Sequence, residues 1–162
     1  MDACRTLVQA LVVSRLDYAS SLLFGINQGH LRKLQRLQDS AARLIFRAPL
    51  CAAPLRQQLH WLPVHDRINF RIVTYVYKSL HGTAPVYLAE LLTTVQQSRN
   101  LRSGDSHRLK VKRTKSKMGE KGFEYCGPVL WNNLAENIKC SKNVIMFKKL
   151  LKTFYFQNAY NL

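Results

Sequence analysis

The stretch 55–92 most constrains the fold, because it carries signals for where helices begin and end. Pro63 precedes an apolar repeat and Gly82 follows its last turn, so the sequence predicts a helix over residues 64–80. Further start signals predict a short helix over residues 84–92. The residues expected to face inward from the longer helix are Ile68, Ile72, Tyr75, Val76 and Leu80. These helix start and stop signals predict an ordered helical core.

The same helical spacing of apolar residues predicts four further main helices, over residues 3–24, 30–47 and 123–134 and after Ser141. A short helix is also expected over residues 55–62, after a loop that contains Pro49 and Pro54. The first helix is expected to bury Leu7, Leu11, Val12, Leu16, Leu22 and Leu23. The second is expected to bury Leu31, Leu34, Leu37, Ala41, Leu44 and Ile45, and the last Val144, Phe147, Leu150, Leu151 and Phe154.

Residues 107–113 differ from the rest, because apolar and basic side chains alternate along them. Such alternation is typical of a strand, so we expect a small basic β-hairpin or ribbon around residues 99–113, pairing 100–102 with 109–113. The predicted fold class is therefore mainly α, a multi-helix domain with this ribbon. A composition shift at Gln96 suggests two parts: a helical domain over residues 1–97, and the ribbon with the C-terminal helices over residues 98–162.

The charge of the chain points to its partners. Lys and Arg number 25 against nine Asp and Glu, which gives a formal net charge of +16. Nucleic acid is the default partner of so basic a chain, and an anionic membrane surface is the main competitor. No stretch approaches the roughly 20 apolar residues that a membrane span needs. We therefore expect an intracellular protein, nuclear or cytoplasmic, neither secreted nor membrane-bound, with RNA or DNA as partner and a protein partner as a further option.

The predicted helix 30–47 carries a basic stripe. At 3.6 residues per turn its four arginines fall within an arc of roughly 60° opposite the apolar side, and a lysine flanks them. Arginine matches phosphate oxygens bidentately, so we favour nucleic-acid contact over an ordinary solvated helix face. These residues are Arg32, Lys33, Arg36, Arg43 and Arg47. The other candidate contacts are Arg108, Lys110, Lys112, Arg113, Lys115, Lys117, Lys148, Lys149 and Lys152. For the ribbon, a solvated edge strand is an equally good interpretation.

Residue patterns that carry catalysis are missing from the sequence. The four cysteines are Cys4, Cys51, Cys126 and Cys140; no two have C-x-x-C spacing, so reduced thiols are expected rather than a metal site. The histidines are dispersed too. No Asp-Asp pair offers clustered carboxylates for a two-metal polymerase, and neither a nucleotide-binding glycine loop nor a G-x-S-x-G elbow occurs. We expect no catalytic residues, no cofactor, no metal and no enzymatic activity.

Several segments, in order along the chain, resemble one family. They are S-R-L-D-Y at 14–18, L-Q-R-L-Q at 34–38, A-A-R-L at 41–44, L-H-W-L-P-V at 59–64, L-R-S at 101–103 and G-P-V-L-W-N-N-L at 127–134. The chain resembles the region that follows the reverse transcriptase palm in jockey-like and chicken-repeat-like non-LTR retrotransposons. It departs from the family pattern at Ala19, Ser20, Gly127 and Ala135.

The resemblance implies a thumb and C-terminal extension of an RNA-directed DNA polymerase, a region that helps to hold template RNA or target DNA. The palm with its metal-binding acids and the endonuclease belong to other parts of that polyprotein. It also implies that residues 1–24 lie at the edge of a larger unit, with an apolar face incompletely covered. We therefore expect a non-catalytic remnant that contacts backbone phosphates of RNA or DNA with low sequence specificity. The alternatives are a protein–protein interaction module from the same region, or a translated relic without function.

Overall fold

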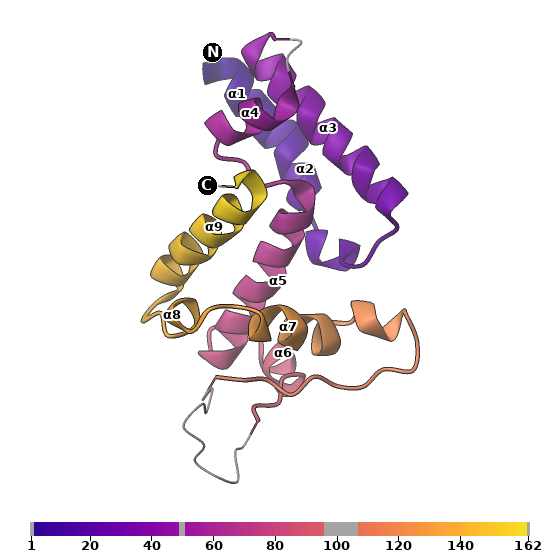
Figure 1. The fold of residues 1–162 in the computed structure, drawn as a ribbon, viewed down its shortest axis with the longest axis vertical. Coiled ribbons are helices and arrows are strands. Elements are labelled where there is room, and N and C mark those ends of the chain that lie inside the picture. The colour runs from indigo at the N-terminus through magenta and orange to yellow at the C-terminus, as the bar shows by residue number, and fades with distance from the viewer. Residues whose placement is uncertain (1, 49–50, 96–106, 162) are drawn as a thin grey trace. The chain divides into compact units, whose positions relative to one another are not determined.

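The computed structural model describes residues 2–48, 51–95 and 107–161, and within these ranges it is mainly helical and contains no β-strand (Figure 1). The predicted mainly α class is thus confirmed. The chain divides into two compact units. Unit 1 comprises Met1–Ile68 and Lys152–Leu162, and unit 2 comprises Asn69–Leu151. Neither boundary coincides with the division predicted between residues 97 and 98.

The predicted helix 3–24 is in fact a series of short segments: α1 (Asp2–Val8), the π-helical η1 (Gln9–Val13), α2 (Ser14–Asp17) and the 3-10 helix η2 (Ser20–Leu23). A π-turn closes i→i+5 hydrogen bonds and therefore rotates the helix face. Val8 and Val13, five positions apart, are buried as a result. Leu7 and Leu11, which the regular 3.6 period placed inward, are 60% and 67% exposed.

Helix α3 (Gln28–Phe46) begins two residues earlier than predicted, because the side chain of Asn27 accepts a hydrogen bond from the Gly29 amide (2.7 Å) and caps the helix. Its buried residues are Gln38, Ala41, Ala42 and Ile45. The prediction that Leu37 and Leu44 face the core is wrong, since they are 50% and 61% exposed. The buried side is rotated toward Gln38, which packs inside in their place.

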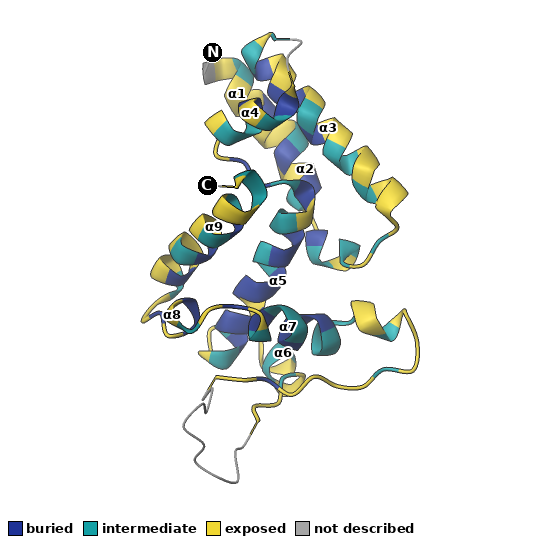
Figure 2. Ribbon diagram, viewed as in Figure 1, coloured by how far each residue is buried: buried dark blue, intermediate teal, exposed yellow. Residues whose placement is uncertain are grey.

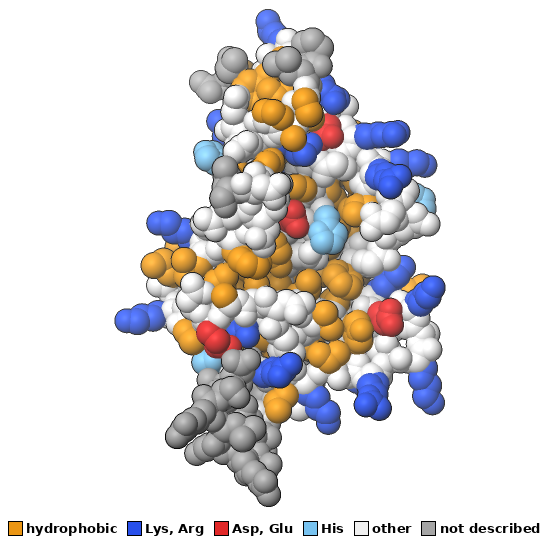
Figure 3. Space-filling model, viewed as in Figure 1, with side chains coloured by type: hydrophobic (Ala, Val, Ile, Leu, Met, Phe, Trp, Pro, Cys, Tyr) orange, Lys and Arg blue, Asp and Glu red, His pale blue; other side chains and the backbone are white. Residues whose placement is uncertain are grey.

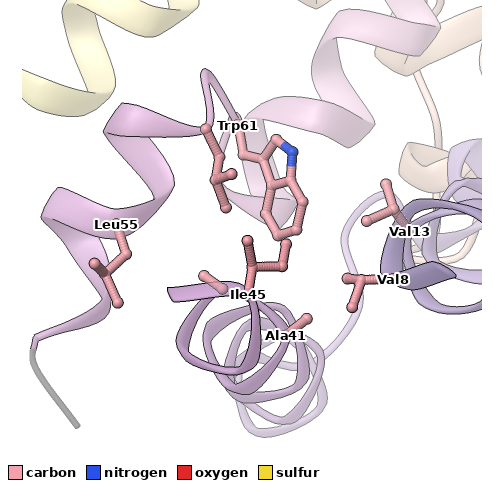
Figure 4. Packing of buried hydrophobic residues seen from close by; sticks show 8 residues of the cluster. Val8, Val13, Ala41, Ile45, Leu55 and Trp61 are labelled. Carbon is pink, nitrogen blue, oxygen red and sulfur yellow. The ribbon is translucent and has the colours of Figure 1, made fainter. Parts of the chain in front are cut away.

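The core of unit 1 forms where α3 meets α1, η1 and α4 (Ala52–Gln58). In Figure 4 the indole of Trp61 lies over Ile45, while Leu55 reaches the same cluster from α4. Helix α4 begins before Pro54, which was predicted to lie in a loop; proline is tolerated in a first turn, where its missing amide has no helical partner. The cluster consists of Val8, Val13, Ala41, Ala42, Ile45, Leu55, Leu59 and Trp61.

Two glutamines of α3 fix the start of α5 (Val64–Leu80). The fully buried Gln38 donates from Nε2 to the Leu62 carbonyl (2.9 Å). Gln35 accepts a hydrogen bond at Oε1 from the Val64 amide (2.9 Å), which is one of the backbone donors that a helix start leaves unpaired. The L-Q-R-L-Q segment thus supplies tertiary hydrogen bonds as well as a helix face.

An ion pair joins two other segments of unit 1. Arg67 donates from Nε and from Nη2 to the two carboxylate oxygens of Asp17, each at 2.8 Å. Both side chains are about four-fifths buried, with exposures of 19% and 20%. The end of α9 (Val144–Tyr160) also belongs to unit 1, and there the Tyr160 hydroxyl donates to the Trp61 carbonyl (2.7 Å).

Unit 2 is built around stacked aromatic rings. Tyr77 of α5 and Phe147 of α9 stack with ring centroids 4.0 Å apart, and Trp131 of α7 (Phe123–Asn132) lies 6.0 Å from Phe147. The Tyr77 hydroxyl donates to the Ser141 carbonyl (2.7 Å). Tyr77 is 1% exposed, whereas Tyr75, which was predicted to face inward, is 39% exposed, so that prediction is wrong. Figure 2 shows the buried stretches along α5. The remaining elements of this unit are α6 (Val86–Glu90), the 3-10 helix η3 (Gly119–Lys121) and α8 (Glu136–Lys139).

The basic ribbon predicted around residues 99–113 is not present in the described part of the chain. Residues 99–106 lie outside the described ranges, so the expected pairing partner 100–102 has no structural counterpart here. Leu109 instead forms an isolated antiparallel bridge with Thr94. The hydrogen bonds of this bridge are made by the neighbouring residues, and the backbone groups of Leu109 itself pair with a side chain. The Leu109 amide donates to Asn132 Oδ1 (2.9 Å) and Asn132 Nδ2 donates to the Leu109 carbonyl (2.8 Å). An amide side chain therefore takes the place of a partner strand.

Candidate nucleic-acid interface

The basic stripe of α3 is exposed as predicted: Arg32, Lys33, Arg36, Arg43 and Arg47 all lie on the surface. The first four lie within the helix. Arg47 follows it as the C-cap in a left-handed conformation (φ 50°), so it does not continue the helical stripe. From Arg32 to Arg43 the helix rises about 17 Å, which matches roughly five steps along one nucleic-acid strand at about 3.4 Å each.

The single acid of α3 does not oppose this charge at the surface. Asp39 pairs with Arg56 of α4 and accepts a hydrogen bond from Gln35 Nε2 (2.8 Å). Its side chain is 19% exposed. Because Asp39 forms its ion pair with Arg56, which is not part of the stripe, the exposed face of α3 keeps its net positive charge.

A second group of cations lies in unit 2, mainly on the segment that begins at Arg108. Its members are exposed, and one of them, Lys112, pairs with Glu124 of α7 (2.7 Å). They line an irregular segment and not the ribbon that was predicted. The exposed residues are Arg108, Lys110, Lys112, Arg113, Lys115 and Lys117, and on α9 Lys148 and Lys149. Lys152, also exposed, belongs to unit 1.

Each unit thus carries basic residues of its own. The space-filling view shows Lys and Arg side chains projecting at the surface at several places, with few Asp or Glu side chains visible among them (Figure 3). Such surfaces can bind polyanions through charge and hydrogen bonds.

Apolar residues also reach the surface of unit 1. Leu7 and Leu11 on α1 and η1, and Leu37 and Leu44 on α3, are each at least half exposed. Tyr18 and Leu22 are more exposed still, at 82% and 80%. The expectation that the apolar face of residues 1–24 is incompletely covered agrees with these values.

Three potential metal ligands meet in unit 2, a grouping that the sequence did not reveal. His107 Nδ1 lies 3.3 Å from Glu136 Oε2, and Cys140 Sγ lies 4.0 Å from each of these atoms. Lys139, whose side chain is 2% exposed, donates to Glu136 Oε1 (3.0 Å). The Glu136 pKa is lowered: partial burial alone would raise it, but the hydrogen bond and charge of Lys139, together with His107, outweigh that effect. The carboxylate is therefore charged at neutral pH.

Cys126 shows the opposite environment. It is buried in α7, and the loss of hydration raises the pKa of its thiol to about 11. The thiol is therefore protonated and unreactive at neutral pH. Of the four cysteines, only Cys140 belongs to a group of three potential metal ligands within the described residues.

Comparisons with known proteins add no relatives: no family model, no curated protein and no solved structure matches the chain. Within the described ranges, no helix combines the length and apolar character that crossing a bilayer requires.

Proposed function

We propose that this chain is a non-catalytic nucleic-acid-binding remnant of a non-LTR retrotransposon reverse transcriptase, which contacts backbone phosphates of RNA or DNA through its basic faces. The observation that carries the binding is the exposed stripe Arg32, Arg36 and Arg43 on α3, whose only acid is paired with Arg56. The retrotransposon origin rests on the sequence segments quoted above. Low sequence specificity follows from contacts to phosphates, which carry no base information.

The strength of binding should depend on salt because neutralised phosphates release counterions. If the stripe and the basic residues after Leu109 together engage about six phosphates, the slope of log affinity against log salt should be near −5 on duplex DNA and shallower on single strands. Arginines that match phosphate oxygens bidentately favour the α3 stripe as the stronger of the two contacts.

The test is a salt-dependent binding titration with single-stranded RNA, single-stranded DNA and duplex DNA. Replacing Arg36 and Arg43 with glutamine should weaken binding to all sequences alike and flatten the slope by about one unit per lost contact. The matched control is Arg5→Gln with Arg15→Gln, which removes the same charge from exposed positions of unit 1 outside the stripe. If both double variants lost the same nucleic-acid affinity, the effect would come from net charge alone, and α3 would not be part of the interface.

A protein-docking function is the second candidate, and the exposed leucines of α1, η1 and α3 favour it. Docking of this kind predicts weak nucleic-acid binding at physiological salt that is indifferent to Arg36 and Arg43. It also predicts that Leu37→Ser, on the exposed side of α3, abolishes association while leaving the helical content unchanged. If Leu37→Ser left the affinity for nucleic acid unchanged and the Arg36→Gln, Arg43→Gln double variant lowered it, nucleic-acid binding would be supported over protein docking.

A further inference from the structure

We propose that His107, Glu136 and Cys140 form a binding site for one divalent cation of the zinc type, with His107 Nδ1, Glu136 Oε2 and Cys140 Sγ as ligands. The three residues come from different parts of unit 2: the segment before Leu109, the first residue of α8, and the residue that follows α8. Each offers one ligand atom, and the three atoms lie within 4.8 Å of one another.

The distances fit a tetrahedral ion closely. With zinc bonds of about 2.0 Å to nitrogen or oxygen and about 2.3 Å to sulfur, two tetrahedral ligands are separated by about 3.3 Å, or about 3.5 Å when one is sulfur. The His107–Glu136 separation is 3.3 Å and both separations from Cys140 are 4.0 Å. Only the sulfur has to approach, by about 0.5 Å, which a small rotation of the Cys140 side chain supplies.

The backbone around the three ligands is held by buried groups. Trp131, which is 1% exposed, donates from Nε1 to the His107 carbonyl (2.7 Å), and Asn132 clamps Leu109 two residues later. The residue after Cys140, Ser141, accepts a hydrogen bond from the buried Tyr77 hydroxyl. These anchors fix the positions of both ends of the site before any ion arrives.

A hydrogen bond from Lys139 orients the Glu136 carboxylate, as hydrogen bonds commonly do for metal-binding carboxylates. Lys139 holds Glu136 Oε1, so that Oε2 is directed to His107 and Cys140. Metal-ligating carboxylates are themselves usually hydrogen-bonded in this way. The ammonium of Lys139 also repels a cation, which lowers the affinity; the thiolate and carboxylate charges together outweigh one ammonium.

The ligand set selects the class of ion. A thiolate and an imidazole favour zinc and other borderline or soft divalent ions over magnesium and calcium, which require oxygen ligands. Three protein ligands leave a fourth tetrahedral position open. A cavity of about 420 Å³ is lined in part by two of the three ligands, His107 and Cys140. The alternative is a hydrogen-bond network without an ion, in which the Cys140 thiol donates to Glu136 Oε2 (4.0 Å), and that network predicts no stoichiometric cobalt band.

The experiment is a titration of the full chain with Co²⁺ alone, without nucleic acid and under a non-thiol reductant, followed by displacement with Zn²⁺. One equivalent of Co²⁺ should give a thiolate-to-cobalt charge-transfer band, which Zn²⁺ removes. Cys140→Ser should abolish the band, and His107→Gln should weaken Co²⁺ binding at least about ten-fold, the least that even changes to outer-shell partners commonly cost. Both side chains are exposed, so circular dichroism should show the fold unchanged in the two variants.

The matched controls are Cys51→Ser and His30→Gln, exposed residues of unit 1 that should leave the band intact. A band that persists in Cys140→Ser, or no band at one equivalent in the folded wild-type chain, would overturn the site. Because no nucleic acid is present, the result is independent of the proposed backbone binding.

Discussion

The Asp17–Arg67 pair offers the most direct test of how unit 1 is held together. The pair joins the S-R-L-D-Y segment to the beginning of α5 through two hydrogen bonds of 2.8 Å. Replacing Asp17 with asparagine removes the charge at nearly constant volume, and Arg67→Met removes the partner while keeping most of the apolar stem. A double-mutant cycle of the two changes isolates their coupling energy.

The magnitude follows from burial. Exposed ion pairs contribute about 0–1 kcal/mol, whereas removing one partner of a fully buried pair costs about 3–5 kcal/mol. With side chains 19% and 20% exposed, this pair lies between the two limits. We expect a coupling energy of about 2 kcal/mol, in line with hydrogen bonds to charged groups.

The assay has to report unit 1 separately, because two units need not unfold in one step. The chain has two tryptophans, Trp61 in unit 1 and Trp131 in unit 2. In a Trp131→Phe background, urea unfolding followed by tryptophan fluorescence therefore reports unit 1 alone. The free energy of unfolding is obtained for the background, both single variants and the double variant.

The control cycle uses the Lys112–Glu124 pair, which has a similar distance of 2.7 Å but side chains 65% and 33% exposed. Its coupling energy, followed through Trp131 in a Trp61→Phe background, should stay below about 1 kcal/mol. A coupling energy for Asp17–Arg67 within about 0.5 kcal/mol of zero, or no larger than that of the control, would refute the reasoning from burial.

Three further predictions concern unit 2 and catalysis. Asn132→Ala should cost about 1–3 kcal/mol and expose the Leu109 amide to hydrogen exchange, whereas Asn133→Ala, at an exposed neighbouring position, should do neither. Glu136→Gln should cost about 1 kcal/mol at pH 7, because Lys139 loses its charged partner, as urea unfolding would measure. Since the folded pKa of Glu136 is lowered, its contribution is present above the ordinary value of 4.5 and is lost as the pH falls through the folded pKa; a pH-independent cost would contradict this. The purified chain should show no magnesium-dependent primer extension, and activity that persists through rigorous purification would contradict a non-catalytic role.

The helical class could be predicted because its signals are local. Pro63 and Gly82 bracket α5, which the structure places at Val64–Leu80 as expected. The basic face of α3 was predictable for the same reason, since exposure of charged side chains follows from helical spacing alone. The C-cap conformation of Arg47 was not, because it depends on where the helix ends and not on its period.

The errors in the predicted core have physical causes that a fixed period cannot represent. The π-turn η1 changes the buried face, so that Val8 and Val13 are buried where a regular period predicts Leu7 and Leu11. In α3 the fully buried Gln38 has a partner in the Leu62 carbonyl, and a paired glutamine can occupy a position that hydrophobicity alone assigns to a leucine.

The His107–Glu136–Cys140 group could not be predicted, because its ligands are 29 and four positions apart along the chain and neither spacing belongs to a compact metal motif. Trp131 and Asn132 bring them together. In the sequence these two residues read as an apolar anchor and a polar neighbour of a short helix. In the structure their side chains hydrogen-bond to the backbone of His107 and Leu109, and so hold the segment before the basic residues against α7. The L-W-N-N-L segment therefore positions both the proposed cation ligand His107 and the start of the second basic group. Asn132→Ala should accordingly weaken Co²⁺ binding as well as the protection of Leu109, whereas an effect on protection alone would show that His107 is held in place by Trp131 without this clamp.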